Sequence, residues 1–162
     1  MKFNNIHSSL KRIGASMLLA GTISSFALAA NPLTAKADVS EKAKKALTDA
    51  FPKAESVKWM ESSNGDVCTA YFWLYDVKTV ASYDRDGNTI SILRYYKEDH
   101  LPVSVLSQIK KKYHDKTIAG VTELTDNNDE VSYYIKLEDS AHWYTVKVSS
   151  EGMEQTEKLN KQ

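Results

Sequence analysis

The sequence has one cysteine and few glycines or prolines, and these shortages exclude several classes of protein. A single Cys among 162 residues cannot form a disulfide framework, so a small disulfide scaffold is excluded. Six Gly and three Pro are too few for a collagen-like or low-complexity chain. Three Trp, nine Tyr and four Phe are too many for intrinsic disorder, so the sequence predicts a folded domain with a core.

Positive and negative charges balance over the whole chain but are unevenly placed along it. Four of the 21 basic residues and none of the 21 acidic residues come before position 38, which leaves 17 basic against 21 acidic residues in the remainder. A mildly acidic body offers no attraction to the phosphate backbone of nucleic acids. The sequence therefore predicts no nucleic-acid partner.

The first 37 residues have the pattern of a secretory signal peptide. Basic residues precede an uncharged apolar stretch, residues 13–30, and small residues stand before a cut after Ala37. The stretch is interrupted by Gly, Ser and Thr, which disfavours the alternative of a permanent membrane anchor. We expect cleavage after Ala37, with Ala29 as the alternative site. The mature chain, residues 38–162, would then have no membrane span and would be periplasmic or secreted.

The mature chain shows the same order of patterns twice. A helical pattern followed by four β-prone runs occupies about residues 38–96, and the same order returns at about residues 101–159. Turn residues recur at matched spacing, as at Gly87 and Gly152. We therefore predict an α+β fold of two tandem helix-plus-four-stranded antiparallel repeats, with the helices on one face of the sheet. The side chains expected in its core are Phe51, Val57, Phe72, Leu137 and Val146, with Trp59 on the same face as Val57.

Several short motifs, taken together, resemble a known family. They are Phe51-Pro52, Val57-Lys58-Trp59, Tyr83-Asp84-x-Asp86-Gly87, Leu101-Pro102 and Tyr113, with looser counterparts in Tyr133-x-Ile135-x-Leu137 and Ser150-x-Gly152. In order and spacing they resemble the PepSY-like, β-lactamase-inhibitor-like family of exported bacterial proteins, over essentially the whole mature chain. The resemblance implies a fold like that of the tandem-repeat β-lactamase inhibitor protein, whose sheet presents a concave binding face. It implies no catalytic residues and does not imply inhibition of a β-lactamase.

No arrangement of residues in the sequence indicates catalysis, a metal site or a cofactor. The turn Asp84-x-Asp86-x-Asn88 lacks the later ligands of a calcium loop, so a hairpin turn is the favoured interpretation. The histidines lack zinc-ligand spacing, and no nucleophile motif is present. Cys68 lies in a β-prone run, where burial is favoured over a reactive thiol or an intermolecular disulfide. We predict that the protein is not an enzyme and has no catalytic residues, metal or cofactor.

Large aromatic residues are predicted to point away from the core. If Phe72 and its neighbours of the same parity face the helices, the residues between them face the other way. Exposed aromatic clusters often mark partner sites, although a loop, the tail or the other half of the sheet could instead cover them. The residues predicted to bind a protein partner are Tyr71, Trp73, Tyr75, Tyr134 and Trp143.

Together these patterns predict a non-enzymatic, exported protein-binding module that uses an aromatic sheet face. Inhibition of an envelope enzyme is one form that such binding could take. The alternative is a periplasmic carrier that binds a small ligand or a lipid on the same face. The sequence names neither the partner envelope protein nor the oligomeric state.

Overall fold

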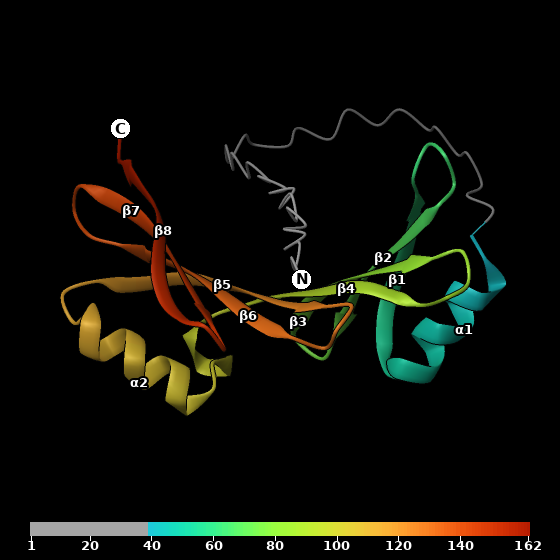
Figure 1. Ribbon diagram of the computed structural model, residues 1–162, viewed down its shortest axis with the longest axis horizontal. Coiled ribbons are helices and arrows are strands. Elements are labelled where there is room, and N and C mark those ends of the chain that lie inside the picture. The colour runs from blue at the N-terminus through green and yellow to red at the C-terminus, as the bar shows by residue number, and fades with distance from the viewer. Residues whose placement is uncertain (1–38) are drawn as a thin grey trace, which may run out of the picture. The chain divides into compact units, whose positions relative to one another are not determined.

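Eight strands form one antiparallel sheet in residues 39–162, the part of the chain that the computed structural model describes (Figure 1). The strands are β1 (Ala54–Glu61), β2 (Val67–Leu74), β3 (Val77–Asp84), β4 (Thr89–Tyr96), β5 (Thr117–Asp126), β6 (Val131–Glu138), β7 (His142–Ser149) and β8 (Gly152–Asn160). Each strand pairs with the next one along the chain, so β1 and β8 form the two edges of the sheet. The predicted signal peptide, residues 1–37, lies outside the described residues.

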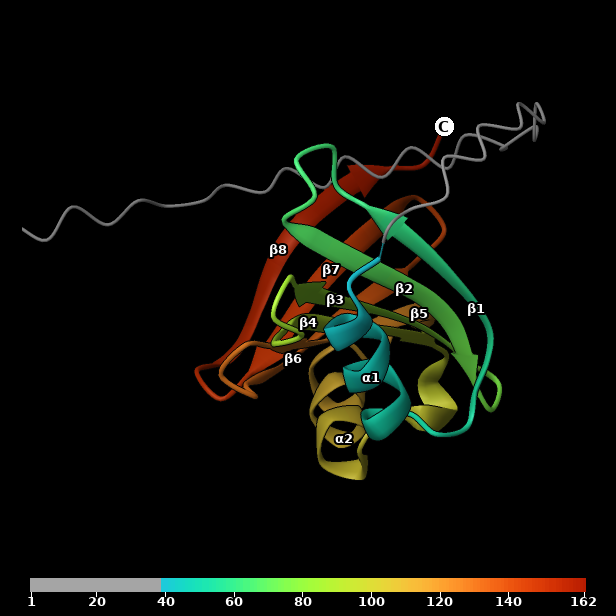
Figure 2. The same ribbon diagram turned by 90° about the vertical axis from the view of Figure 1, so that its right-hand side faces the viewer.

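Two ten-residue helices lie against the same face of this sheet, as Figures 1 and 2 both show. Helix α1 (Glu41–Ala50) precedes β1. Helix α2 (Val103–Lys112) follows a single turn of 3-10 helix, η1 (Glu98–His100), in the connection from β4 to β5. Each helix buries one apolar stripe, as an amphipathic helix on a sheet should. We call the other face of the sheet, which no helix of the described residues covers, the open face.

The predicted fold class of two tandem helix-plus-four-stranded repeats is wrong. β4 pairs with β5 from Ser91↔Asp126 to Tyr96↔Val121, so the sheet continues unbroken where the two repeats were expected to meet. Residues 39–162 contain only two α-helices, both short, and the sheet of eight strands dominates this part of the chain. Turn residues recur along the sequence because every hairpin of a meander needs them, and that recurrence does not require a repeated unit.

Two clusters of apolar side chains fill the space between the sheet and the helices. The cluster under α1 consists of Val39, Ala43, Leu47, Phe51, Cys68, Ala70, Phe72, Ala81 and Tyr83. The cluster under α2 consists of Leu101, Val105, Ile109, Tyr113, Val121, Ile135, Leu137, Tyr144, Val146 and Val148. Removing this apolar surface from water is the main favourable contribution to folding. The buried faces of both helices and of five strands, β2, β3, β5, β6 and β7, are thereby fixed.

Four of the five predicted core residues are confirmed as buried: Phe51, Phe72, Leu137 and Val146. The prediction for Val57 is wrong, because 37% of its surface is exposed. The register of β1 shifts between Glu55 and Lys58, and Ser56 there has a φ of 55°. Such a β-bulge re-aims the side chains of an edge strand. Trp59, beyond the bulge, is half-buried and packs against the cluster under α1.

The turn between β3 and β4 anchors the start of α1. Asp84 accepts hydrogen bonds on Oδ1 from the main-chain N–H groups of Asp86 (2.8 Å) and Asn88 (2.9 Å), which is a hairpin-turn arrangement as predicted. Hydrogen bonds from Asn88 hold the pKa of the Asp84 carboxyl below its usual value. Lys42 Nζ lies 2.6 Å from Asp86 Oδ1, and the Ser40 hydroxyl donates to a carbonyl in the same turn.

Candidate functional site

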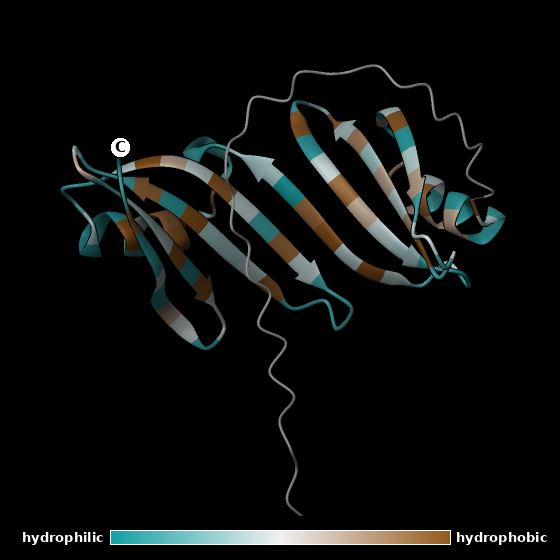
Figure 3. Ribbon diagram, turned by 90° about the horizontal axis from the view of Figure 1, so that it is seen from above, coloured by the Kyte–Doolittle hydropathy of each residue, from teal (hydrophilic) through white to brown (hydrophobic). Residues whose placement is uncertain are grey.

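Side chains alternate between the core and the open face along the strands. Figure 3, which shows the sheet from above, displays this alternation of hydrophobic and hydrophilic residues. On β2, Phe72 is 2% exposed, whereas Tyr71 and Trp73 on either side of it are 36% and 47% exposed. Since successive side chains of a strand point to opposite faces, Tyr71 and Trp73 lie on the open face.

The pairing register carries this aromatic surface across the sheet. Trp73 pairs with Lys78 on β3, and Lys78 pairs with Tyr95 on β4. The same row continues through Thr122 on β5 to Tyr134 on β6. Tyr95 is 39% exposed, and Tyr134 is half-buried. Neighbouring strands are about 4.8 Å apart, so side chains in one row form a continuous surface.

A second row on the open face is apolar and lies beside the first. Tyr71 pairs with Val80, Val80 with Leu93, and Leu93 with Leu124. Val80 is only 8% exposed although neither α1 nor α2 covers it, which indicates that the larger side chains around it shield it. Burial, with a smaller contribution from the Tyr71 hydroxyl, raises the pKa of Tyr95. We call Tyr71, Trp73 and Tyr95 the aromatic patch.

The two remaining predicted partner-binding residues lie in different surroundings. Trp143 is on the open face opposite Glu138, and two lysine ammonium groups lie close to its ring. Lys136 Nζ is 4.5 Å and Lys161 Nζ is 4.4 Å from the ring centroid, distances typical of cation–π contacts. Tyr75 is in the turn after β2, with a φ of 57° and an exposure of 69%, so it lies at the end of the sheet and not within a row.

A hollow of about 420 Å³ opens beside the aromatic patch. It is lined by Ser56, Lys58, Tyr71, Phe72, Trp73 and Lys78. Ser56 belongs to the bulge in β1, so the hollow lies where the register of that strand shifts. The lining therefore combines two exposed aromatic rings with two lysines and contains no acidic residue.

Several residues of this surface were missed by sequence reasoning. Tyr95, Lys78 and Val80 join it only through the register of β3 and β4. β4 has apolar residues of both parities, as at Ile92 and Leu93, so alternation alone does not tell which face is open. Tyr95 is two residues after Leu93 on β4, so both side chains point to the same face of the sheet. This spacing was the only local signal that Tyr95 belongs to the open face.

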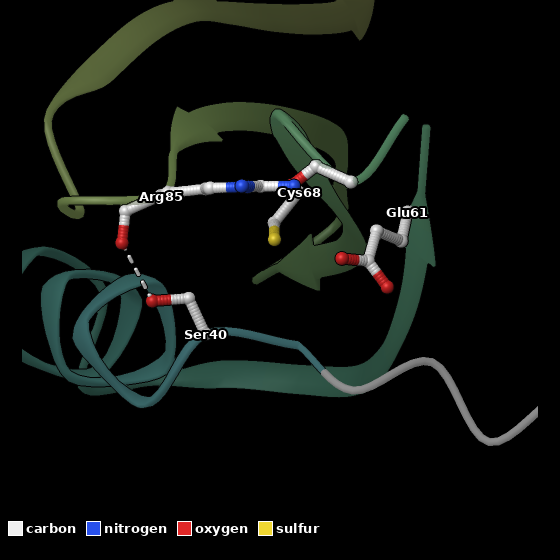
Figure 4. Close-up of a pocket in the computed structure, with 5 residues that line it drawn as sticks. Ser40, Glu61, Cys68 and Arg85 are labelled. Atoms are coloured by element: carbon white, nitrogen blue, oxygen red, sulfur yellow. Dashed lines mark hydrogen bonds between the residues drawn. The ribbon is translucent and has the colours of Figure 1, made fainter. Parts of the chain in front are cut away.

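A second hollow, of about 360 Å³, lies between the start of α1 and the first hairpin (Figure 4). Its lining consists of Ser40, Glu61, Gly65, Cys68 and Arg85. The Arg85 guanidinium donates hydrogen bonds to the main-chain carbonyls of Gly65 (2.7 Å) and Asn64 (2.8 Å). Cys68 is 1% exposed and unbridged, as predicted for a buried residue. These contacts hold two turns together and leave no evident reactive group.

Within residues 39–162, no three His, Cys, Asp or Glu side chains are grouped so that they could hold a metal ion. No helix in this range is long and apolar enough to cross a membrane.

Comparison with known proteins finds solved structures of similar fold, but it assigns the chain to no family. No protein-family model matches the sequence, and no curated protein matches it. Among solved structures, a BLIP-like protein from Bacteroides fragilis has a TM-score of 0.60 and 18% identity, over 75% of this chain and 85% of that chain. A DUF2874 family protein from Bacteroides uniformis has a TM-score of 0.58 and 16% identity, over 74% of this chain and 88% of that chain.

A third similar structure is described as a candidate periplasmic protein from Bacteroides eggerthii. Its TM-score is 0.58 and its identity 16%, over 74% of this chain and 87% of that chain. At these identities the likeness is one of fold alone. It supports the fold that the resemblance to β-lactamase-inhibitor-like proteins implied, whereas the PepSY-like label is not confirmed.

Proposed function

We propose that the protein is a non-enzymatic, exported protein-binding module that engages its partner through the open face. The observation that carries this proposal is the exposure of Tyr71, Trp73 and Tyr95 in adjoining rows of one sheet face. Large aromatic side chains bury about 150–250 Å² each, so three of them can anchor an interface. Tyr134 and Trp143 extend the proposed surface towards β7, and Tyr75 lies at its rim.

The comparisons support the same proposal from a separate direction. A BLIP-like protein and a candidate periplasmic protein have this fold, and neither description names an enzyme. The predicted signal peptide supports a periplasmic or secreted location. Inhibition of an envelope enzyme would follow if the partner's active site is the surface that the open face covers.

A small-ligand or lipid carrier is the second candidate, and the hollow of about 420 Å³ beside the aromatic patch favours it. Pockets for small molecules usually enclose most of the ligand's surface. The apolar row that continues from the hollow through Val80 and Leu93 is more extended than a small ligand would need. Protein binding therefore accounts for more of the open face.

The test compares capture of envelope proteins by the wild-type protein and by a Tyr71→Ala, Trp73→Ala double variant. We expect a stoichiometric protein partner for the wild type and a sharp loss of capture for the variant. Val103→Ala is the matched control, because Val103 is an 82% exposed apolar residue on α2, away from the open face. It should leave capture unchanged.

Two outcomes would contradict the proposal. Capture that survives in the double variant would place the binding surface elsewhere. A small molecule that remains bound in native mass spectrometry, with no protein partner, would favour the carrier. Thermal unfolding of each variant must be measured alongside, so that a loss of folding is not mistaken for a loss of binding.

A further inference from the structure

Two lysines flank the exposed aromatic residues of β2 without an acidic partner. Lys58 on β1 is opposite Tyr71, and Lys78 on β3 is opposite Trp73. Neither lysine forms an ion pair within residues 39–162, whereas Lys42 pairs with Asp86 at 2.6 Å. Both line the hollow beside the aromatic patch. The hollow therefore concentrates positive charge on a chain whose body carries more acidic than basic residues.

Other groups near the two lysines form no ion pair with them among residues 39–162. Glu55 is opposite Trp73 on β1, but it forms an ion pair with neither lysine. Lys78 Nζ lies 5.8 Å from the centroid of the Tyr95 ring, a cation–π contact that does not neutralise the ammonium. An anion entering the hollow would thus meet two cationic groups, with aromatic surface between them.

The shape of the surrounding face indicates what carries the anion. The apolar row through Val80, Leu93 and Leu124 starts at Tyr71, which also lines the hollow. A free anion would fill the hollow but leave the partly exposed Leu93 and Leu124 of that row in water. Anionic membranes are recognised by clusters of about four to eight basic residues, and two lysines fall short of this. A protein segment with one acidic and one apolar side chain would cover both features.

We propose that the hollow receives the carboxylate of an Asp or Glu in a loop of a partner protein, with an adjacent apolar side chain of that loop on the same row, over Leu93 and Leu124. This inference rests on the proposed protein-binding function and adds the chemistry of the partner. Charge complementarity of this kind sets which partner is accepted and how binding depends on salt. Lys58 and Lys78 are the residues that confer this selectivity, and the aromatic patch supplies the apolar contact.

The experiment selects binders from a phage-displayed library of disulfide-constrained random heptapeptides against the purified protein. Enriched peptides are synthesised, and their dissociation constants are measured by fluorescence anisotropy at low and at raised salt. We expect the peptides to carry Asp or Glu next to an apolar residue. Changing that acid to its amide, or combining Lys58→Gln with Lys78→Gln, should each weaken binding by about ten-fold. Raised salt should weaken it as well.

Two matched variants make the result specific. Lys97→Gln with Lys111→Gln removes the same charge from the sequence near η1 and α2, and it should leave binding unchanged. Lys58→Glu with Lys78→Glu should recover binding to a peptide whose acid is replaced by Lys.

The outcomes separate this inference from the proposed function. Enriched peptides that need Tyr71 and Trp73, but carry no acid and tolerate Lys58→Gln with Lys78→Gln, would overturn the carboxylate subsite and leave the binding face intact. Peptides whose affinity is unchanged by Tyr71→Ala and Trp73→Ala would overturn both the carboxylate subsite and the proposed binding face. A selection that yields no binder would overturn the subsite, since two unpaired lysines beside exposed aromatics should retain some acidic peptides.

Discussion

Gly87 lies directly against the main chain of Lys42: a methyl group built on its Cα would be 2.8 Å from the Lys42 carbonyl oxygen. Gly87 also has a φ of 84°, in the left-handed region that disfavours residues with a side chain. Gly87→Ala should therefore lower the free energy of unfolding by more than about 1 kcal/mol, as measured by urea denaturation. Gly120→Ala is the control, because a Cβ there has no heavy atom within 4 Å. Equal stability of the two variants would contradict the close contact between α1 and the β3–β4 turn.

Tyr83 has a buried hydroxyl without a hydrogen-bond partner among the described residues. Leaving such a group unpaired costs about 1–3 kcal/mol, so Tyr83→Phe should stabilise the protein by about 1 kcal/mol in urea denaturation. Tyr96→Phe should destabilise it, because the Tyr96 hydroxyl donates a 2.6 Å hydrogen bond to Glu123. If both changes destabilise the protein, Tyr83 has a partner after all.

Tyr83 should also make the protein less stable at alkaline pH. Burial raises the pKa of Tyr83 to about 12 from an ordinary value of 10. As pH rises above 10, the unfolded chain releases this proton before the folded one does, so unfolding becomes more favourable up to about pH 12. The Tyr83→Phe variant should lack this contribution, which is measurable as a shallower fall in the unfolding midpoint over that range.

Asp139 should have the opposite effect on the pH dependence of stability and make the protein less stable in acid. A 2.6 Å hydrogen bond from the Tyr144 hydroxyl, with others from the main chain of Ala141 and His142, holds the pKa of Asp139 well below its usual value of 3.8. Its stabilising contribution is complete above that value and is lost as pH falls through and below 3.8, because the unfolded chain is protonated first. Asp139→Asn should thus be destabilised at neutral pH, and its deficit should shrink in acid.

The control for this prediction is Asp129→Asn. The Asp129 carboxylate accepts no side-chain or main-chain hydrogen bond among residues 39–162, and its turn tolerates Asn. This substitution removes a carboxylate without removing any hydrogen bond to it, so it should cost little stability at neutral pH. A deficit of Asp139→Asn that does not change with pH would show that the hydrogen bonds to Asp139 do not favour the ionised form.

What the sequence could predict was limited to features that depend on near neighbours. Alternation within one strand correctly placed Leu137 and Val146 in the core, and the comparison of the two halves of the chain placed Phe72 there. The alternation failed at Val57, because the bulge at Ser56 adds a residue that the hydrophobic pattern does not indicate.

Features set by distant pairing were not predictable in this way. The pairing of β4 with β5 joins strands on either side of an intervening helix, and turn signals alone suggested two tandem repeats without giving that pairing. Tyr95 and Lys78 join Trp73 only through the registers on both sides of β3. The candidate site was therefore anticipated at Tyr71 and Trp73, but not its apolar row or its lysines.

The junction of β4 and β5 contains a testable ion pair. Arg94 Nη1 lies 2.9 Å from Glu123 Oε1, and the Glu123 side chain is 13% exposed. Glu123→Leu should destabilise the protein by about 1–3 kcal/mol, because it leaves the half-buried guanidinium without its partner. Adding Arg94→Met should restore part of that loss in a double-mutant cycle. Strictly additive effects would mean that the pair does not couple the two strands.

Phe72 and Trp73 are adjacent on β2 and provide the most direct test of the open face. Phe72 is 2% exposed, and its ring centroid lies 5.0 Å from that of Phe51, so Phe72→Ala should cost about 3–5 kcal/mol of unfolding free energy. Trp73 is 47% exposed, so Trp73→Ala should change stability by no more than about 1 kcal/mol while abolishing most partner capture. Urea denaturation and capture measured on the same two preparations give both quantities. If Trp73→Ala is as destabilising as Phe72→Ala and capture persists, Trp73 is part of the core and the open face is not the binding surface.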